Sequence, residues 1–537
     1  NATIKKRDAW LSGSPFLQKG VIMDKRRVTI ESGELQGCFG WDPRITVFKG
    51  IPYAAPPIGD LRWRAPQPVE KWDGVRIADN YGPMSIQDVP GLDPKEFWTK
   101  ELHPAGPEFE MSEDCLYLNV FTPAKIGNEK LPVLVYIHGG GLMGGYPYEI
   151  EFDWEHVARK GIVVVAVAYR LGILGFLSHP WLSAEHPDEP KGNYGYLDQL
   201  AAIKWTGRNI AAFGGDPEKI TIAGQSAGAG SVLAQLSSPM AQGAFRAAIV
   251  QSGIIMDFSD TDSKSWVCTL EEAEKTGKEF FEKAGFHNLE EARACPALKL
   301  HELQKKLASA GLSYGFTPPI DHIFMKETPV EAMVRDHWGE RPVIFGYTKD
   351  ELKMFNRLSG SSLTNMKEYL EVAELYGDKK DEFLKITNCH TDEDVQKLGE
   401  TDVYMTLVAS TIMGAFVRNS QGHRTYIYEF ACDIPGEDNP GAYHGAELAF
   451  AYDALARMWR PFTGKSYDMA RYINSYWMNF VKNTDPNGVT NFGEELPKWD
   501  AFTADKPMKM NFTDKCEETQ IAIDPLMKLR YEISYEK

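Results

Sequence analysis

A serine near the middle of the chain stands among small residues at the end of an apolar stretch. The segment "KITIAGQSAGAGSV" runs from Lys219 to Val232 and centres a Gly-x-Ser-x-Gly pattern on Ser226. Ile220 and Ile222 predict a strand before the serine, and the small residues after it predict a helix. A sharp strand-to-helix turn exposes a hydroxyl, as the nucleophile of an acyl-transfer enzyme requires. The pentapeptide alone is equally well explained by a turn serine that caps the helix.

A glycine-rich loop meets a second requirement of that chemistry, which is a set of donors for an oxyanion. The segment "YIHGGGLMGG" (136–145) follows a predicted strand and contains Gly140 and Gly141. Backbone N–H groups left free by such a loop can bind the charged oxygen of a tetrahedral intermediate. A flexible turn or a phosphate loop is the alternative. A phosphate loop usually continues with Lys-Ser/Thr, where this chain has Leu-Met-Gly-Gly.

A nucleophilic serine also needs a base, and the base needs a carboxylate to orient it. Around a serine of this kind, the chain order is serine, acid, histidine. His444 lies in the glycine-rich segment "NPGAYHGAELAF" before an apolar helix, and Asp350 and Glu351 follow the predicted strand at 341–346. A histidine taken at random is more often an ordinary surface or core residue. An acid pair in a loop is usually only solvated charge.

The elements that must position these residues alternate between strands and helices. Helical spacing of apolar residues predicts helices in 197–215 and 467–483. This alternation is typical of an α/β protein with a large, mostly parallel central sheet flanked by helices. The N-terminal segments "RRVTIESGELQGCF" and "ITVFKGIPYA" instead predict antiparallel strands. Short Val- and Ile-rich runs predict the buried strands, at 131–137, 161–169, 219–224, 247–253, 341–346 and 424–430.

The chain is interpreted as one large domain with insertions. Residues 1–27 are assigned to an N-terminal extension and residues 28–537 to a single domain, because no change in composition marks a second one. The stretches at about 258–340 and 352–420 are charged and helical in pattern. We expect them to be helical insertions over the active site.

The composition argues against several other classes of protein. The 537 residues are 43% hydrophobic and 25% charged, as in an ordinary globular protein, and the net charge is −17. An acidic surface repels nucleic acid and anionic membranes, so neither is expected as the main partner. No apolar run approaches the ~18 residues that indicate a membrane span. Seven scattered cysteines without a CxxC pair argue against a metal site, and no metal or organic cofactor is expected.

Longer motifs make the chain resemble the type-B carboxylesterases, the family of the cholinesterases and fungal lipases. In chain order they are "FKGIPYAAPPIGDLRWRAPQP", "SEDCLYLNVFTP", "YIHGGG", "NYGYLDQLAAIKWTGRNIAAFGGDPEKITIAGQSAGAGS" and "GAYHGAEL". The resemblance covers about 28–530 and is closest in style to bacterial members. It implies an α/β-hydrolase fold and a serine esterase without a cofactor. The site residues that it implies are the nucleophile Ser226, the base His444, the acid Glu351 and the oxyanion donors Gly140, Gly141 and Ala227.

The same resemblance implies two structural ion pairs and one unpaired thiol. The ion pairs are Arg62 with Glu113 and Arg170 with Asp198. The usual disulfide partner of Cys115 is missing, so a free buried thiol is expected there. The glycine that normally follows the acid is Leu352 in this chain.

Departures from the family pattern bear on the substrate. Cholinesterases carry Glu before the serine and a Trp ahead of the "EDCL" motif, where this chain has Gln225 and Ala105. A cationic ester therefore loses an anionic and an aromatic partner, and we expect hydrolysis of neutral carboxylic esters. Gln225, Leu142 and Trp98 are candidate substrate contacts.

Two alternatives to a general esterase remain at this stage. One is a specialised feruloyl or acetyl esterase acting on plant polysaccharide, and the other is a non-catalytic adhesion module on the same fold. The bacterial style favours a cytoplasmic location, with secretion after removal of a signal peptide as the alternative. An aromatic-friendly pocket for feruloyl groups would use Trp98, Phe97, Tyr146, Tyr148, Phe152 and Trp154.

Overall fold

The computed structural model describes most of the chain. Ala105 and Leu352, which the sequence analysis singled out, and most of the extension 1–27 lie outside the described residues. No helix in the described part is both long and apolar enough to cross a bilayer. The described residues are 26–88, 97–102, 110–253, 267–309, 316–351, 353–354 and 363–535.

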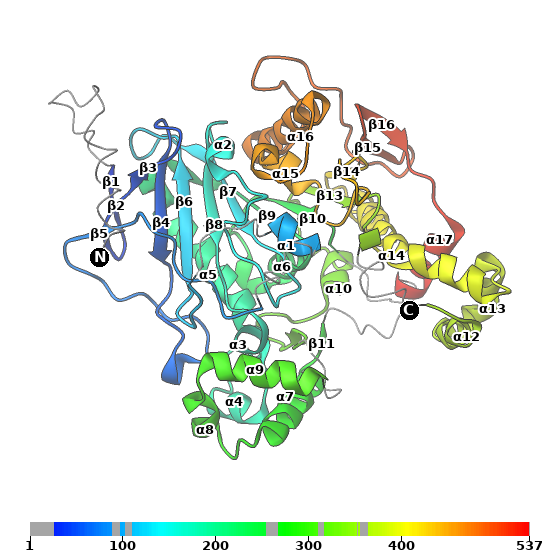
Figure 1. Cartoon of the computed structure of the whole chain (residues 1–537), viewed down its shortest axis with the longest axis horizontal. Coiled ribbons are helices and arrows are strands. Elements are labelled where there is room, and N and C mark those ends of the chain that lie inside the picture. The colour runs from blue at the N-terminus through cyan, green and yellow to red at the C-terminus, as the bar shows by residue number, and fades with distance from the viewer. Residues whose placement is uncertain are drawn as a thin grey trace, which may run out of the picture.

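An 11-stranded sheet forms the centre of the protein. Figure 1 shows it crossing the molecule from β3 and β4 on one side to β15 and β16 on the other. In spatial order its strands are β16 (Cys516–Gln520), β15 (Met508–Phe512), β14 (Thr425–Phe430), β13 (Val343–Thr348), β10 (Ala247–Gln251), β9 (Gly215–Gln225), β7 (Leu131–Ile137), β8 (Val163–Val167), β6 (Tyr117–Thr122), β4 (Thr46–Pro52) and β3 (Cys38–Phe39).

The middle of this sheet is parallel and its margins are antiparallel. All neighbouring pairs from β8 through to β15 run parallel, whereas β8–β6, β6–β4, β4–β3 and β15–β16 are antiparallel. The predicted α/β fold with antiparallel N-terminal strands is therefore confirmed. A second sheet joins β1 (Arg27–Ile30) and β2 (Gly33–Gln36), an antiparallel pair as expected, with β5 (Val75–Ile77).

Each central strand serves two hydrophobic cores. In β7, Val133 and Val135 belong to one core, and Leu134 and Tyr136 belong to the other, because successive side chains point to opposite faces. The helices α5 (Tyr194–Asn209) and α6 (Ala227–Ser237) contribute to the first core. The helices α2 (Trp154–Ala158), α15 (Leu448–Ala451) and α16 (Gly464–Asn483) contribute to the second. Helices on both faces keep the parallel strands out of water.

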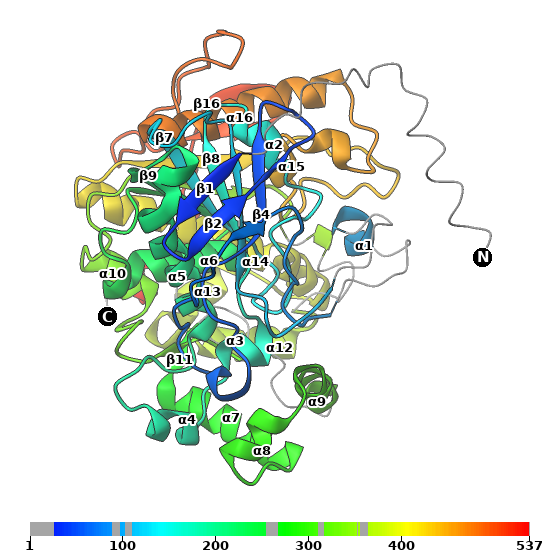
Figure 2. The ribbon, with the colours of Figure 1, turned by 90° about the vertical axis from the view of Figure 1, so that its left-hand side faces the viewer.

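Two groups of helices extend the sheet scaffold. Between β10 and β13 lie α7 (Leu270–Ala284), α8 (Leu289–Ala294), α9 (Ala297–Ser309) and α10 (Pro329–Val334). Figures 1 and 2 both show α7, α8 and α9 beside α4 (Pro180–Glu185) at one end of the molecule.

The second group joins residues from two distant parts of the chain. The helices α12 (Met366–Glu374), α13 (Lys380–Thr387) and α14 (Asp392–Ser420) lie between β13 and β14. Helix α14 packs on both of those strands, and α17 (Pro525–Tyr535) packs on α13 and α14. The second group is therefore anchored to the sheet and closed by the C-terminal helix.

Candidate active site

Ser226 occupies a strained turn between β9 and α6. Its backbone has φ 58° and ψ −125°, a conformation that side-chain-bearing residues rarely adopt. The turn is tight, because a Cβ added at Gly228 would lie 2.3 Å from the carbonyl oxygen of Ile137. The Ser226 N–H donates to the Gln251 carbonyl at 2.9 Å, which ties the turn to β10. The turn that the sequence predicted is present, and Ser226 lines the main cavity.

The glycine loop after β7 lines the same cavity. Gly140 and Gly141 have φ of 99° and 64°, in the left-handed region that favours glycine. Gln87 clamps the far end of the loop, because its side chain accepts from the Gly145 N–H at 2.7 Å and donates to the Gly145 carbonyl at 3.0 Å. Within the described residues, no hydrogen bond is found for the N–H groups of Gly140, Gly141 and Ala227. These donors are free to bind an oxyanion.

His444 and Glu351 meet at the ends of two other segments. Glu351 follows β13, and one of its carboxylate oxygens contacts Nδ1 of His444. The other oxygen accepts from the Ser252 hydroxyl at 2.6 Å and from the Thr348 N–H at 2.8 Å. The neighbouring Asp350 points elsewhere and accepts from the Ala442 N–H at 2.8 Å. The structure thus brings Glu351, not Asp350, to the histidine.

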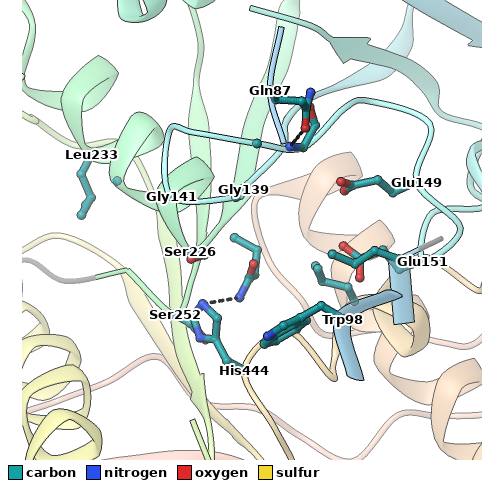
Figure 3. A pocket seen from close by; sticks show the side chains of 18 of the residues that line it. Gln87, Trp98, Gly139, Gly141, Glu149, Glu151, Ser226, Leu233, Ser252 and His444 are labelled. Carbon is teal, nitrogen blue, oxygen red and sulfur yellow. Dashed lines mark hydrogen bonds between the residues drawn. The ribbon is translucent and has the colours of Figure 1, made fainter. Parts of the chain in front are cut away.

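Glu351 and burial act in opposite directions on the pKa of His444. Burial opposes the charged imidazolium, but the charge and hydrogen bond of Glu351 outweigh it and raise the pKa of His444. With the Nδ1 proton facing Glu351, Nε2 carries the lone pair of the neutral ring. Gln225 lies beside it, its amide nitrogen 3.2 Å from Nε2 of His444 (Figure 3). The residue before the serine therefore contacts the base.

The cavity that collects these residues measures about 700 Å³ and has two chemically different sides. Figure 3 shows Leu233 on one side and Glu149, Glu151 and Trp98 on the other. The aliphatic lining residues are Leu102, Leu233, Ala234, Val267, Met325, Pro329, Leu407 and Leu448. The lining also includes Gln87, Asp88, Trp98, Glu101, Glu149, Glu151, Tyr196 and Tyr443.

The other candidate substrate contacts lie in different surroundings. Leu142 belongs to the hydrophobic core and is not among the residues that line the cavity. Of the six aromatic residues considered, Trp98 alone is among the lining residues. Phe152 and Trp154 stack on each other at 4.8 Å in the core beneath the sheet. Of the rings proposed for a feruloyl substrate, only Trp98 therefore lines the cavity, beside Tyr196 and Tyr443.

The expected ion pairs and free thiol are present and lie outside the cavity lining. Arg170 makes two bonds of 2.8 Å to Asp198, and both side chains are buried. Arg62 makes a 2.6 Å bond to Glu113 and also donates to backbone carbonyls of α8 and the residue after it. Cys115 is free and fully buried. These groups hold loops together and are structural.

Several functional neighbours had no signal in the sequence analysis. Ser252, in the segment "QSG" after β10, has φ 54° and supports Glu351. Glu447 lies behind the histidine, and burial together with the charge of Glu351 raises its pKa to about 7. Glu149 and Glu151 face the cavity from a loop in which no motif was apparent. A strand-end serine with positive φ is visible only once the backbone is known.

Comparison with known proteins agrees with this geometry. The model of the carboxylesterase family matches residues 24–525. The chain belongs to the carboxylesterase family. It is 34% identical to a fumonisin B1 esterase of Sphingopyxis macrogoltabida, over 86% of this chain and 82% of that protein, and 34% identical to carboxylesterase 1D of Rattus norvegicus, over 86% and 84%. The protein is thus a carboxylic-ester hydrolase.

Solved structures of family members share the fold. A PNB esterase aligns with a TM-score of 0.79 and 29% identity, over 94% of this chain and 99% of that one. A carboxylesterase of Geobacillus stearothermophilus aligns with a TM-score of 0.72 and 30% identity, over 94% and 99%. This carboxylesterase therefore has the α/β-hydrolase fold that the sequence predicted. A catalytic triad and an oxyanion hole are typical of the family.

Proposed function

We propose that the protein hydrolyses carboxylic esters through an acyl-enzyme, with Ser226 as nucleophile, His444 as base and Glu351 as acid. The observation that carries the proposal is the contact of His444 with the buried Glu351, beside a cavity that also receives Ser226 from its strained turn. The alternative of a non-catalytic module is disfavoured, since such a module has no need of three such groups in one place.

Each group has a defined step. The Ser226 hydroxyl attacks the ester carbonyl carbon while Nε2 of His444 takes its proton. The N–H groups of Gly140, Gly141 and Ala227 stabilise the oxyanion. The C–O bond to the alcohol then breaks, and His444 returns the proton to the leaving alkoxide. Water repeats the sequence on the acyl-enzyme and releases the acid.

Gln225 adds a step before the attack. Its amide occupies the Nε2 lone pair of His444 that must accept the serine proton. A neutral hydrogen bond of this kind contributes only about 0.5–1.5 kcal/mol net, so the bound substrate can displace it. In the resting enzyme the contact holds His444 in the tautomer that catalysis needs.

The test is Ser226→Ala, assayed with p-nitrophenyl acetate. The variant is expected to fold, because no hydrogen bond to the hydroxyl is found within the described residues, and to lose turnover, because no nucleophile remains. Ser420→Ala, the same change at an exposed serine at the end of α14, is the control and retains turnover. Activity of Ser226→Ala near that of the control would refute the assignment.

A further inference from the structure

The acidic side of the cavity has no place in the mechanism above. Glu149 and Glu151 stand two residues apart in the segment "YPYEIEFD", between the glycine loop and α2. Figure 3 shows their carboxyl groups pointing from that loop into the pocket, near Trp98. The question is what two neighbouring acids do in a cavity that receives an ester.

Neither acid has a cationic partner among the described residues. The Glu149 side chain is 6% exposed, and one of its oxygens accepts from the Tyr146 N–H at 3.3 Å, whereas the other accepts no hydrogen bond. Within the described residues, no hydrogen bond or ion pair is found for the Glu151 carboxylate. Glu149 is buried and Glu151 is partly buried, so a ligand that supplies hydrogen-bond donors would stabilise their carboxylates.

The other two acids in the cavity lining, Glu101 and Asp88, have basic partners. Glu101 bonds to Arg460 at 2.6 Å and to the Trp459 indole at 2.9 Å. Asp88 bonds to Lys305 at 2.7 Å and contacts His301 at 3.0 Å. Among the acids of the described cavity lining, Glu149 and Glu151 are therefore the two without a cationic partner.

The raised pKa values of Glu149 and Glu151 agree with their lack of a cationic partner. Burial raises the pKa of Glu149 to about 8, and burial together with the charge of Glu149 raises that of Glu151 well above its usual range. Arg457, which lowers the pKa of the neighbouring Tyr146, donates to the Phe152 carbonyl. The other titratable groups that face the pair are Glu447, Glu101, Tyr136, Tyr146, Tyr148, Tyr169 and Tyr443.

We propose that the ester substrates of this enzyme carry a protonated primary or secondary amine, which Glu149 and Glu151 bind beside the ring of Trp98. An ammonium group supplies N–H donors for the open oxygens and a charge that compensates theirs. An aromatic face attracts a cation through the negative charge density of its ring. The apolar side around Leu233 remains for the hydrocarbon part. The proposal rests on the proposed function only for placing the ester carbonyl at Ser226.

This inference revises the expectation of a purely neutral substrate. That expectation followed from Gln225 and Ala105, the two positions where cholinesterases carry an acid and an aromatic ring. The cavity instead presents acids and a ring from other segments, at Glu149, Glu151 and Trp98. The charge preference of a pocket depends on all its walls, whichever segment supplies them.

The first experiment is calorimetric titration of the enzyme with straight-chain alkylammonium ions, from butyl to octyl. Primary alcohols with the same alkyl chains are the neutral controls. Several chain lengths are tested because the best length for the cavity is not known beforehand. We expect the best ammonium ion to bind at least about tenfold more tightly than its alcohol, or ~1.4 kcal/mol. The preference should grow as pH rises through about 8, because the carboxyl groups must ionise to pair with the ligand. Equal binding of ammonium and alcohol would overturn the proposal.

Variants then assign the preference to the acid pair. Glu149→Gln and Glu151→Gln keep the shape of the side chain and are expected to reduce the preference, and the double variant should abolish it. Glu371→Gln removes the same charge from an exposed position on α12 and should leave the preference intact. Each variant is compared only after thermal unfolding shows a folded protein, and the single variants suffice if the double one does not fold. A preference that survives in the folded Gln variants would overturn the assignment.

A separate readout distinguishes this inference from the proposed function. Turnover of p-nitrophenyl acetate, which has no amine, reports on Ser226 chemistry alone. Ammonium binding without such turnover would refute the proposed function and keep the subsite. Turnover without ammonium preference would keep the proposed function and refute the subsite.

Discussion

Glu351 and Glu149 are both buried carboxylic acids, but their hydrogen-bond partners differ. Glu351 is buried with partners on both oxygens, namely His444, the Ser252 hydroxyl and the Thr348 N–H. Glu149 is buried almost as deeply with one long hydrogen bond. The difference teaches that a buried acid whose partners come from the chain positions machinery. One without such partners leaves its interaction for a ligand.

The largest expected effect comes from neutralising the partnered acid. Glu351→Gln keeps the shape but lacks the charge that favours the imidazolium, and its amide can hold the wrong tautomer of His444. We expect a loss of up to ~10⁴ in kcat, measured with p-nitrophenyl acetate. Asp350 accepts from the Ala442 N–H and does not contact the histidine, so Asp350→Asn should reduce kcat far less. A reversed result would mean that the acid is the other residue of the pair.

A smaller effect is expected from breaking a buried pair away from the cavity. Asp198→Asn leaves the Arg170 guanidinium buried without its carboxylate, and should lower the free energy of unfolding by about 3–5 kcal/mol in urea titration. Glu31→Gln removes the partner of Arg208 at the exposed surface, where the expected change is below about 1 kcal/mol. Similar losses for the two variants would contradict the distinction between buried and exposed pairs.

The smallest effect is expected for Glu149. Its sign is opposite, because the substitution should raise the free energy of unfolding. The unfolded chain ionises Glu149 at its ordinary pKa of 4.5, while the folded protein keeps it protonated up to about 8. Unfolding is therefore favoured progressively as pH rises between these values. Glu149→Gln removes that penalty, so its unfolding free energy should exceed that of the wild type by at least ~1 kcal/mol at pH 8, and by less at pH 5.

The control for that prediction is Glu371→Gln, measured in the same buffers. It removes an exposed charge and should follow the pH dependence of the wild type. A Glu149→Gln variant whose stability runs parallel to the wild type from pH 5 to pH 8 would show that Glu149 is not held protonated by the fold.

Much of the fold could be predicted because apolar patterns report burial directly. The runs at 131–137, 219–224 and 424–430 became β7, β9 and β14, since strands covered on both faces need continuous apolar residues. The turn at Ser226 could be predicted because close packing at Gly228 tolerates no side chain. Local sequence determines these features, so local sequence was enough.

The acidic side of the cavity could not be predicted in the same way. No motif in the sequence marks Glu149 and Glu151, and their place in the cavity lining depends on segments far away in the chain. Phe152 and Trp154 were candidates for an aromatic pocket, and the structure places them in the core on the second face of the sheet. Whether a loop residue lines the cavity or packs in the core depends on tertiary contacts, which no single segment of the sequence determines.

The central claim is that Ser226 carries the acyl group. The most direct measurement is mass spectrometry of the enzyme after reaction with diethyl p-nitrophenyl phosphate, which transfers a phosphoryl group to an activated serine. We predict one diethylphosphoryl adduct, on the peptide that contains Ser226, absent in Ser226→Ala and formed much more slowly in Glu351→Gln. An inactivated enzyme with its adduct on another residue, or Ser226→Ala labelled as fast as the wild type, would contradict the account.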